Sequence, residues 1–513
     1  AEIVDRYDFK HGNAFHAGDG NLHPLIFFDS RDTDQLKRVK KAGWEIMEAC
    51  VELGGTISGE HGVGLEKIEA MRLVFSEPDF VAQRGLQQAF DPNRLLNPGK
   101  VIPISTPEEN IDETRTRPQF DSTGSLRAIE KEIGERIQGA AAGSTGLIPA
   151  GVGTFPHFGN LPTRECQHLT SSALNEILEF DPYNQFVTAG AGVALDVLQH
   201  QLAEHHQWLP VRPSFCLQDH SLGGVLARAA CGPERMHYGP PRDLVLGLRF
   251  LDGSGQKIST GGKVVKNVAG YDMTRLMIGS AGTLGLITEV TCRVMTIPER
   301  CSVIGAQGPL SACADLASEM VTSRLIPVFI VMLPINGQGD EAIRRRWKLK
   351  IGFEGFDKTV TEQLKRTQEI FEKAGMTISR VQDYLIQEGI FKKSYSELLA
   401  SAFILRADLP LDRMPGFVES LDRWLPQSKL FCDYGCGRIF AAFENMPDGL
   451  WGRLCETGDH LGGHVVMEKA TDEFKKHNDV FGIDRPEWKI MQRIKSTLDP
   501  QHVFSPGRLP GKV

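Results

Sequence analysis

The sequence predicts an α+β protein with more than one domain, and three observations lead to this prediction. Its 513 residues are more than one hydrophobic core normally organises. Short apolar runs typical of strands alternate with amphipathic helical patterns. An Asp-Pro pair followed, after five residues, by a Pro-Gly pair closes a helical pattern twice, at residues 91–99 and 499–507. Because the full spacing recurs, we interpret the chain as a fusion of two related units.

Composition excludes several classes of protein. The net charge of -8 leaves no basic tract that would neutralise a phosphate backbone, so nucleic acid is not an expected partner. The ten cysteines lack the spacing of a disulfide framework, which favours a reducing compartment. Cys432 and Cys436 do not belong to a CxxCxxC run, so we expect any iron-sulfur cluster to be on a partner subunit.

Targeting signals are weak. Apolar stretches such as residues 326–334 are too short to span a bilayer, and the N-terminus lacks a basic-then-apolar signal pattern. We therefore expect a cytoplasmic protein, at most peripheral on the inner membrane. The chain begins at Ala1 without Met, which indicates a processed start or a fragment of a longer fusion.

The pattern divides the chain into four parts. Residues 1–103 contain a metal-type motif, residues 104–118 are a polar linker, and residues 119–298 form a glycine-rich α/β domain. Residues 299–513 combine helical and strand patterns and predict an α+β cap domain. The helices are expected at 362–374, 415–424 and 485–498, and the strands at 328–333, 439–443 and 464–467.

A glycine turn follows an apolar strand at residues 147–154. Gly151 and Gly153 allow successive backbone amides to point into one concavity, which suits a pyrophosphate. The turn differs from the Rossmann fingerprint because Pro156 stands where the third glycine would be. Taken alone, this turn favours a plain loop over a pyrophosphate site.

Further motifs follow at regular distances: SLGG at 221–224, YG and RD within 238–243, KVVKNVAGYD at 263–272 and IGSAGTLGLITE at 278–289. In this order they resemble the PCMH-type FAD-binding domain of the vanillyl-alcohol-oxidase superfamily. The KNVAGYD and GSxGTLG segments are similar to those of the second FAD-binding subunit of glycolate oxidase. The resemblance covers nearly all of residues 119–298.

The resemblance implies FAD, with its pyrophosphate over residues 151–154 and 223–224 and its isoalloxazine near Tyr271 and Gly282. Some members attach flavin through a His in the first glycine turn, where this sequence has Thr154, so we expect non-covalent FAD. Tight backbone packing is the alternative role for the later glycines. The expected FAD-binding residues are Pro149, Gly151, Val152, Gly153, Thr154, Ser221, Gly223, Gly224, Tyr271, Gly282, Gly285 and Ile287.

The N-terminal part contains HAGDGNLHP at 16–24 and SGEHGVG at 58–64. Two imidazoles and one carboxylate can hold a divalent ion and leave positions open for substrate. Two histidines seven residues apart are more often a solvated or core pair than metal ligands. The spacing alone therefore leaves a metal site open.

These motifs resemble the C-terminal part of the catalytic flavin subunit of glycolate oxidase, and they occur in related D-lactate and D-2-hydroxyglutarate dehydrogenases. The resemblance implies that His16, His23 and Glu60 are ligands of Zn, Mn or Fe, and that His61 is the base for the substrate hydroxyl. Related D-2-hydroxyglutarate enzymes have Asn where this chain has Leu25, which favours a small substrate.

Together the resemblances imply FAD-dependent oxidation of a small 2-hydroxyacid, glycolate to glyoxylate or D-lactate, with hydride transfer to flavin N5 and electrons passing to an iron-sulfur partner. In the family the catalytic FAD domain precedes the first motif. We therefore expect a longer parent chain or a second polypeptide to supply it.

Two alternatives stay open at this point. One is a D-lactate dehydrogenase. The other is a non-catalytic electron-transfer or assembly subunit, because the segment after residue 299 has no HxGDGNxH equivalent. His464 and His477 are expected to be structural or solvated. The glycine-rich run 434–438 could approach the flavin or form a strand turn.

Overall fold

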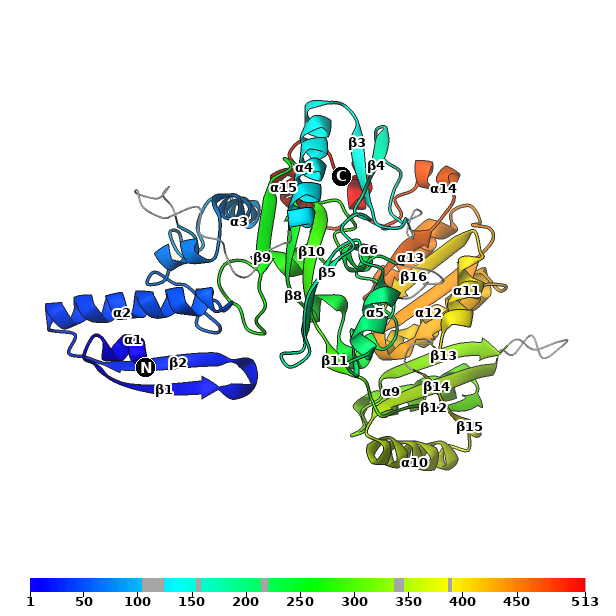
Figure 1. Ribbon diagram of the computed structural model, residues 1–513. Helices are drawn as coiled ribbons and strands as arrows, with labels where there is room; N and C mark the ends of the chain where they lie inside the picture. Colours follow the sequence, from blue (N-terminus) through cyan, green and yellow to red (C-terminus); the bar gives the residue numbers. More distant parts are fainter. Residues whose placement is uncertain (104–123, 154–157, 214–219, 336–345, 386–389, 513) are drawn as a thin grey trace.

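The computed structural model describes residues 1–103, 124–153, 158–213, 220–335, 346–385 and 390–512 (Figure 1). A hairpin with its helices lies at one end, an eight-stranded sheet lies at the other, and a five-stranded sheet lies between them. The predicted linker, residues 104–118, lies outside the described residues.

The N-terminal segment, residues 1–103, is a two-stranded antiparallel hairpin covered by helices. Asp32 caps the long helix by accepting from the N–H groups of Asp34 and Gln35, and Ser76 with Asp79 forms a capping box on the last one. The elements are α1 (Glu2–Asp5), β1 (Lys10–His16), η1 (Ala17–Asp19), β2 (Asn21–Phe27), α2 (Thr33–Glu52), η2 (Glu69–Leu73) and α3 (Glu77–Phe90).

The hairpin leaves apolar side chains in solvent. Phe15, Leu22, Leu25 and Phe27 are each more than half exposed. A two-stranded sheet with an uncovered apolar surface is marginally stable in water. The exposed apolar side chains therefore indicate that this hairpin is an incomplete part of a larger sheet.

The glycine-rich domain, residues 124–297, is built on a five-stranded antiparallel sheet of order β5-β6-β10-β8-β9. Arg249 on β8 lies 3.1 Å from Glu289 on β10 and 3.6 Å from Glu130 on α4, which fixes that helix to the sheet. The strands are β5 (Ile177–Asp181), β6 (Phe186–Gly190), β8 (Val245–Leu251), β9 (Lys257–Gly261) and β10 (Leu286–Arg293); the helices are α4 (Gly124–Ala142), α5 (Leu195–Ala203), α6 (Leu222–Arg228) and α8 (Met273–Met277).

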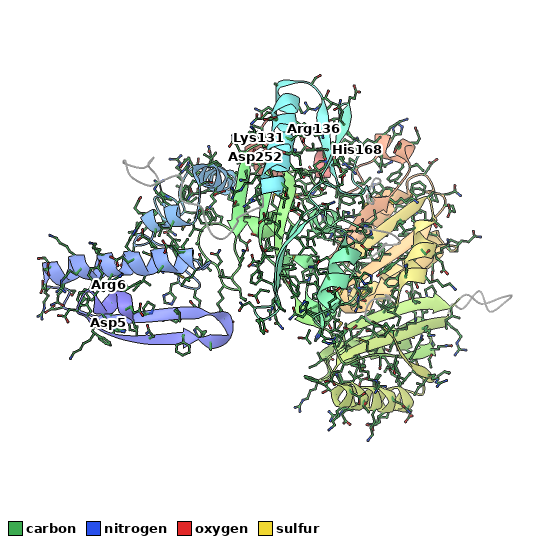
Figure 2. The ribbon with its side chains drawn as sticks, in the orientation of Figure 1. Asp5, Arg6, Lys131, Arg136, His168 and Asp252 are labelled. Atoms are coloured by element: carbon green, nitrogen blue, oxygen red, sulfur yellow. The ribbon has the colours of Figure 1, made fainter. Side chains whose placement is uncertain are left out.

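A separate parallel pair, β3 (Gly146–Ala150) and β4 (Cys166–Thr170), lies beside α4. Figure 2 shows Lys131 and Arg136 on this helix, with His168 of β4 nearby. The guanidinium of Arg136 donates to the carbonyl of His168 at 3.4 Å. The strand predicted at 147–150 is therefore confirmed, with the glycine turn directly after it.

The C-terminal domain contains an eight-stranded antiparallel sheet of order β15-β12-β14-β13-β17-β18-β16-β19. Its larger core joins the sheet to α9, α10, α12 and α13, and a smaller core joins it to α11. The strands are β12 (Arg300–Gly308), β13 (Phe329–Ile335), β14 (Arg346–Gly355), β15 (Thr377–Asp383), β16 (Phe403–Asp408), β17 (Lys429–Asp433), β18 (Arg438–Phe443) and β19 (His464–Lys469); the helices are α9 (Leu310–Thr322), α10 (Asp357–Lys373), α11 (Lys392–Leu399), α12 (Met414–Trp424) and α13 (Leu450–His460).

The helices and strands predicted within residues 299–513 are confirmed to within five residues, but the last helix, α15 (Trp488–Leu498), packs on the glycine-rich domain. The run 434–438 forms a turn between β17 and β18, with Gly437 in the left-handed region at φ 68°. His464 lies 3.3 Å from Asp408, and His477 lies on the surface beside Glu473. None of the described helices is both long and apolar enough to cross a membrane.

The tail of the chain leaves the eight-stranded sheet and returns to the glycine-rich domain. It comprises α14 (Asp472–His477), α15 (Trp488–Leu498) and the second Asp-Pro turn. Ile494 and Leu498 belong to the core of the glycine-rich domain, and the N–H of Leu147 donates to the carbonyl of Val503 at 2.7 Å. Helix α15 also packs along α3, a helix of the N-terminal segment. The last residues thus join all three parts of the molecule.

Candidate functional site

The first candidate centre lies at the tip of the N-terminal hairpin. Gly20, at φ 65°, allows the tight turn that places His16 and His23 diagonally across the two strands, with ring centroids 5.4 Å apart. Glu60 arrives from the second motif, and its carboxylate oxygens lie 3.7 Å from Nε2 of His16 and 3.6 Å from Nε2 of His23. The predicted trio therefore converges on one point.

Gly59 makes this approach possible. A Cβ at Gly59 would lie 2.9 Å from the side-chain oxygen of Asn21, so a larger residue would push the loop away from the hairpin. The ligand atoms of the trio all lie within 4.8 Å of one another, and in the described part of the chain this is the one such group of three. Two imidazoles and a carboxylate at this separation fit a divalent ion.

His61 lies beside the trio. Its ring centroid is 5.4 Å from that of His23, and its side chain is exposed. The imidazole can thus reach a small molecule held at the trio, and a neutral imidazole can accept a proton near pH 7.

Lys266, on the glycine-rich domain, also reaches this centre, and sequence reasoning missed it. Its ammonium lies 2.5 Å from a carboxylate oxygen of Glu60 and 2.7 Å from one of Asp19. Hydrogen bonding from Lys266 holds the pKa of the Glu60 carboxyl below its usual range. The ammonium of Lys266 thus pairs with two carboxylates, Asp19 and Glu60, beside the two imidazoles.

Backbone and side-chain bonds clamp the two domains together at this point. The N–H of Val268 donates to the carbonyl of Ser58 at 3.1 Å, and the hydroxyl of Thr56 donates to the side chain of Asn267 at 3.2 Å. The KVVKNVAGYD segment, expected only beside a flavin, therefore also holds the loop that carries Glu60.

The second candidate site is formed by the glycine turns of the glycine-rich domain. A Cβ at Gly151 would overlap the hydroxyl oxygen of Ser221, and one at Gly282 would lie 3.0 Å from Pro149. Gly153 and Gly282 both have positive φ. Gly151 thus packs against Ser221 of the second predicted turn, and Gly282 of the third packs against Pro149, so the three turns lie together at one place that could hold a dinucleotide. Val152, at this turn, is 49% exposed, and Thr154 lies outside the described residues.

Two of the predicted glycines use their N–H groups inside the protein. The N–H of Gly223 donates to the carbonyl of Ala191 at 2.8 Å, and the N–H of Gly224 donates to the Ser221 hydroxyl at 3.2 Å. A Cβ at Gly223 would lie 2.7 Å from that of Ala191. Tight packing is therefore one demonstrated role of Gly223.

Three other predicted residues lie in packed positions. Ile287 is buried on β10, and a Cβ at Gly285 would lie 2.6 Å from the carbonyl oxygen of Leu251. The N–H of Tyr271 donates to the side chain of Gln83 on α3 at 3.2 Å, and its side chain hydrogen-bonds Gln87. The structure thus brings Tyr271 to the contact with the N-terminal segment.

A charged cluster lies where the glycine-rich domain meets the eight-stranded sheet, and sequence reasoning also missed it. Glu468 on β19 pairs with Arg228 of α6 and lies 3.0 Å from Arg406. Asp408 lies 2.7 Å from Arg438, and these neighbouring cations lower its pKa despite burial. The alternation of Arg406 and Asp408 along one strand was the available signal, but their partners depend on strand order.

Comparison with known proteins identifies two of the parts described above. Residues 1–101 and 481–509 match the family described as FAD linked oxidases, C-terminal domain, and residues 129–261 match the FAD binding domain. The glycine-rich domain is therefore an FAD-binding domain. The solved structure of an alkyldihydroxyacetonephosphate synthase shares the fold, with a TM-score of 0.53 over 73% of this chain and 75% of that one, at 19% identity.

Among curated proteins, the chain is 28% identical over 377 residues to glycolate oxidase subunit GlcE of Escherichia coli, covering 73% of this chain and 95% of GlcE. It is 48% identical over 103 residues to GlcD of Escherichia coli, covering 20% of this chain and only 21% of GlcD. GlcD of Bacillus subtilis is 25% identical over 398 residues, 71% of this chain and 84% of that protein. The chain belongs to the FAD-linked oxidases with a PCMH-type FAD-binding domain and is homologous to the glycolate oxidase subunits GlcE and GlcD.

Proposed function

We propose that this chain takes part in the FAD-dependent oxidation of a small 2-hydroxyacid, glycolate to glyoxylate. FAD binds non-covalently at the turns around Gly151 and Gly282, and the proton-abstracting centre lies in the N-terminal segment. The observation that carries the proposal is the convergence of His16, His23 and Glu60 beside His61. The homology to subunits of glycolate oxidase supports the substrate class.

His16, His23 and Glu60 would hold a divalent ion at the tip of the hairpin. When bound, the ion supplies a Lewis acid for the 2-hydroxyl group, and FAD supplies the hydride acceptor. His61 takes the hydroxyl proton on its imidazole, and Lys266 holds the carboxylate of Glu60 toward the two imidazoles. Leu25 offers no polar group for a second carboxylate, which favours glycolate over a longer diacid.

The N-terminal segment requires a partner for this function. Its two-stranded sheet exposes four large apolar side chains, and the chain spans only 21% of the length of GlcD from Escherichia coli. A further FAD-binding half, on a second polypeptide or on a longer parent chain, therefore completes the reacting centre in this proposal. We further propose that electrons pass from FAD to an iron-sulfur subunit. The cysteines of the described residues are separate thiols, six of the nine buried, so in this proposal the cluster belongs to the partner.

The test is an absorbance spectrum of the purified chain, alone and together with Escherichia coli GlcD from which the 103 matching residues have been removed, before and after anaerobic addition of glycolate, with D-lactate in parallel. We expect flavin bands that persist for the chain alone and bleach for the pair. A His61→Asn variant should keep the bands and lose the bleaching, whereas the matched change His464→Asn should keep both.

Three results would contradict the proposal. Absence of flavin bands would rule out FAD binding. Bleaching of the chain alone would rule out the need for a second polypeptide. Bleaching at an unchanged rate in the His61→Asn pair would remove that imidazole from the reaction.

A further inference from the structure

The two Asp-Pro turns have the same local structure. Both lie in stretches that match the FAD linked oxidase C-terminal domain. Asp91 accepts from the N–H groups four and five residues later at 2.9 and 2.7 Å, and Asp499 does the same at 2.8 and 2.8 Å. Positive φ angles recur at equal positions: Arg94 and His502 (53° and 51°), Asn97 and Ser505 (44° and 44°), and Gly99 and Gly507 (73° and 83°).

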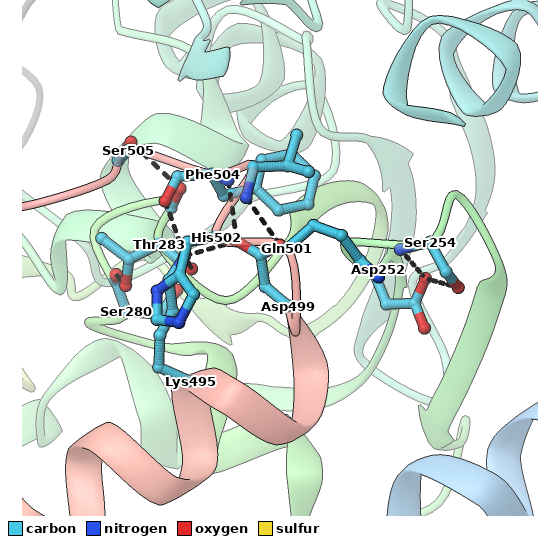
Figure 3. Close-up of polar contacts among 12 residues, drawn as sticks. Asp252, Ser254, Ser280, Thr283, Lys495, Asp499, Gln501, His502, Phe504 and Ser505 are labelled. Atoms are coloured by element: carbon cyan, nitrogen blue, oxygen red, sulfur yellow. Dashed lines mark hydrogen bonds and ion pairs between the residues drawn. The ribbon is translucent and has the colours of Figure 1, made fainter. Parts of the chain in front are cut away.

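The second Asp-Pro turn, residues 499–507, is docked on strand β3. The N–H of Leu147 donates to the carbonyl of Val503, and the N–H of Ser505 donates to the carbonyl of Leu147, both at 2.7 Å. Val503 and Phe504 are fully buried. Lys495 adds a bond from its ammonium to the carbonyl of Phe504 at 2.6 Å (Figure 3). Residues 503–505 thus extend the β3–β4 sheet.

The first Asp-Pro turn, residues 91–99, leaves the corresponding positions exposed to solvent. Leu95 and Leu96, which correspond to Val503 and Phe504, are 76% and 69% exposed. Phe90 is 57% exposed, whereas its counterpart Leu498 is buried. In the described part of the chain, no strand pairs with residues 95–97. The first copy therefore has the docking conformation without the strand on which such a segment docks.

Strand β3 of a second molecule of this chain cannot serve as the docking strand for residues 95–97. One edge of β3 pairs with β4, and the other edge pairs with residues 503–505 of its own chain. The occupant must be another FAD-binding domain whose first strand has an open edge. GlcD of Bacillus subtilis aligns over 398 residues, far more than the 103 that match in Escherichia coli GlcD, so GlcD proteins also contain a region that aligns with this chain's FAD-binding domain.

We propose that Leu95 and Leu96 dock beside the first strand of a second FAD-binding domain, of the GlcD class, in which the edge of that strand is open. The inference rests on the proposed function, and it names the surface through which the second polypeptide binds. Main-chain bonds add residues 95–97 to the partner's sheet, and Phe90, Leu95 and Leu96 bury their side chains against it. Gln87 stands at the position of Lys495, so this contact lacks the buried ammonium of the second copy.

The test co-expresses the affinity-tagged full chain with Escherichia coli GlcD from which the 103 matching residues have been removed. We expect the chain to keep the shortened GlcD soluble and to co-purify with it at one to one. The Leu95→Asp/Leu96→Asp variant should lower the recovered GlcD at least tenfold. Leu53→Asp, at a residue 89% exposed just after α2, should leave recovery unchanged. Circular dichroism should be the same for all three chains, because the side chains are exposed.

Full-length GlcD, whose own segment fills its strand edge, should not be retained through residues 95–96. The inference is overturned if the shortened GlcD stays insoluble or unbound with the wild-type chain, if the double variant retains it, or if the chain alone forms a dimer that the double variant dissolves. A pair that forms as expected but shows no bleaching with glycolate would count against the proposed function and leave the docking intact.

Discussion

Removing the carboxylate of Asp499 should destabilise the FAD-binding domain far more than the same change at Asp91. Both carboxylates accept two backbone N–H groups in the same geometry. Only Asp499 also neutralises a buried ammonium: Nζ of Lys495 lies 2.5 Å away, and neither side chain has any exposure (Figure 3). The two variants therefore differ mainly in one uncompensated charge.

The magnitude follows from this difference. Breaking a buried ion pair by removing one partner costs about 3–5 kcal/mol. At Asp91 water can reach the released N–H groups, because Leu95 and Leu96 are exposed, and the loss of a capping carboxylate costs about 1 kcal/mol. We expect Asp499→Ala to lower the free energy of unfolding by about 3 kcal/mol more than Asp91→Ala. The double variant Lys495→Met/Asp499→Ala should recover at least half of that loss, because it removes the stranded ammonium.

The assay is urea unfolding of the four chains, followed by circular dichroism and by flavin fluorescence to identify the transition of the FAD-binding domain. Equal midpoints for Asp499→Ala and Asp91→Ala would refute the reasoning. So would a double variant less stable than Asp499→Ala, because the ammonium would then contribute stability without its partner.

Two of three further predictions concern the candidate sites, and the third concerns Asp433, a buried carboxyl at the end of β17. Gly151→Ala should lower the FAD content of the purified chain at least tenfold, because its Cβ overlaps the neighbouring turn, whereas Gly139→Ala, which has open space, should not. His23→Ala should abolish zinc or manganese retention measured by mass spectrometry after dialysis, and His464→Ala should leave it unchanged. Burial raises the pKa of Asp433 to about 7, so the folded state keeps a proton that the unfolded state releases near its ordinary pKa of 3.8. Stability should fall from pH 5 to pH 8 by about 3 kcal/mol more in the wild type than in Asp433→Asn, measured by urea unfolding; equal slopes would contradict this.

Much of the fold could be predicted from local pattern. The strand before Gly151, the helices at α10 and α12, and the turn after β17 follow from periodicity and glycine placement. The trio of His16, His23 and Glu60 was predicted by family resemblance, and the geometry agrees because a short hairpin turn necessarily brings the two imidazoles together.

The contacts that sequence reasoning missed join residues far apart in the chain. Lys266 meets Glu60 across 206 positions, and no local spacing reports such a pairing. Tyr271 is expected near the flavin, and sequence reasoning missed that its N–H also donates to Gln83 of α3. The two Asp-Pro turns were recognised as a repeat from the sequence. Only the structure shows that the side chains of the second turn are buried and that those of the first turn are exposed.

The most direct test of the account is the flavin content of the purified full chain. After acid precipitation, FAD in the supernatant is quantified against the protein. The account predicts one FAD per chain, all of it released, because the chain contains one FAD-binding domain with a non-covalent site. No flavin would contradict the assignment of the glycine turns, two per chain would contradict the placement of a single flavin domain, and flavin in the precipitate would contradict non-covalent binding.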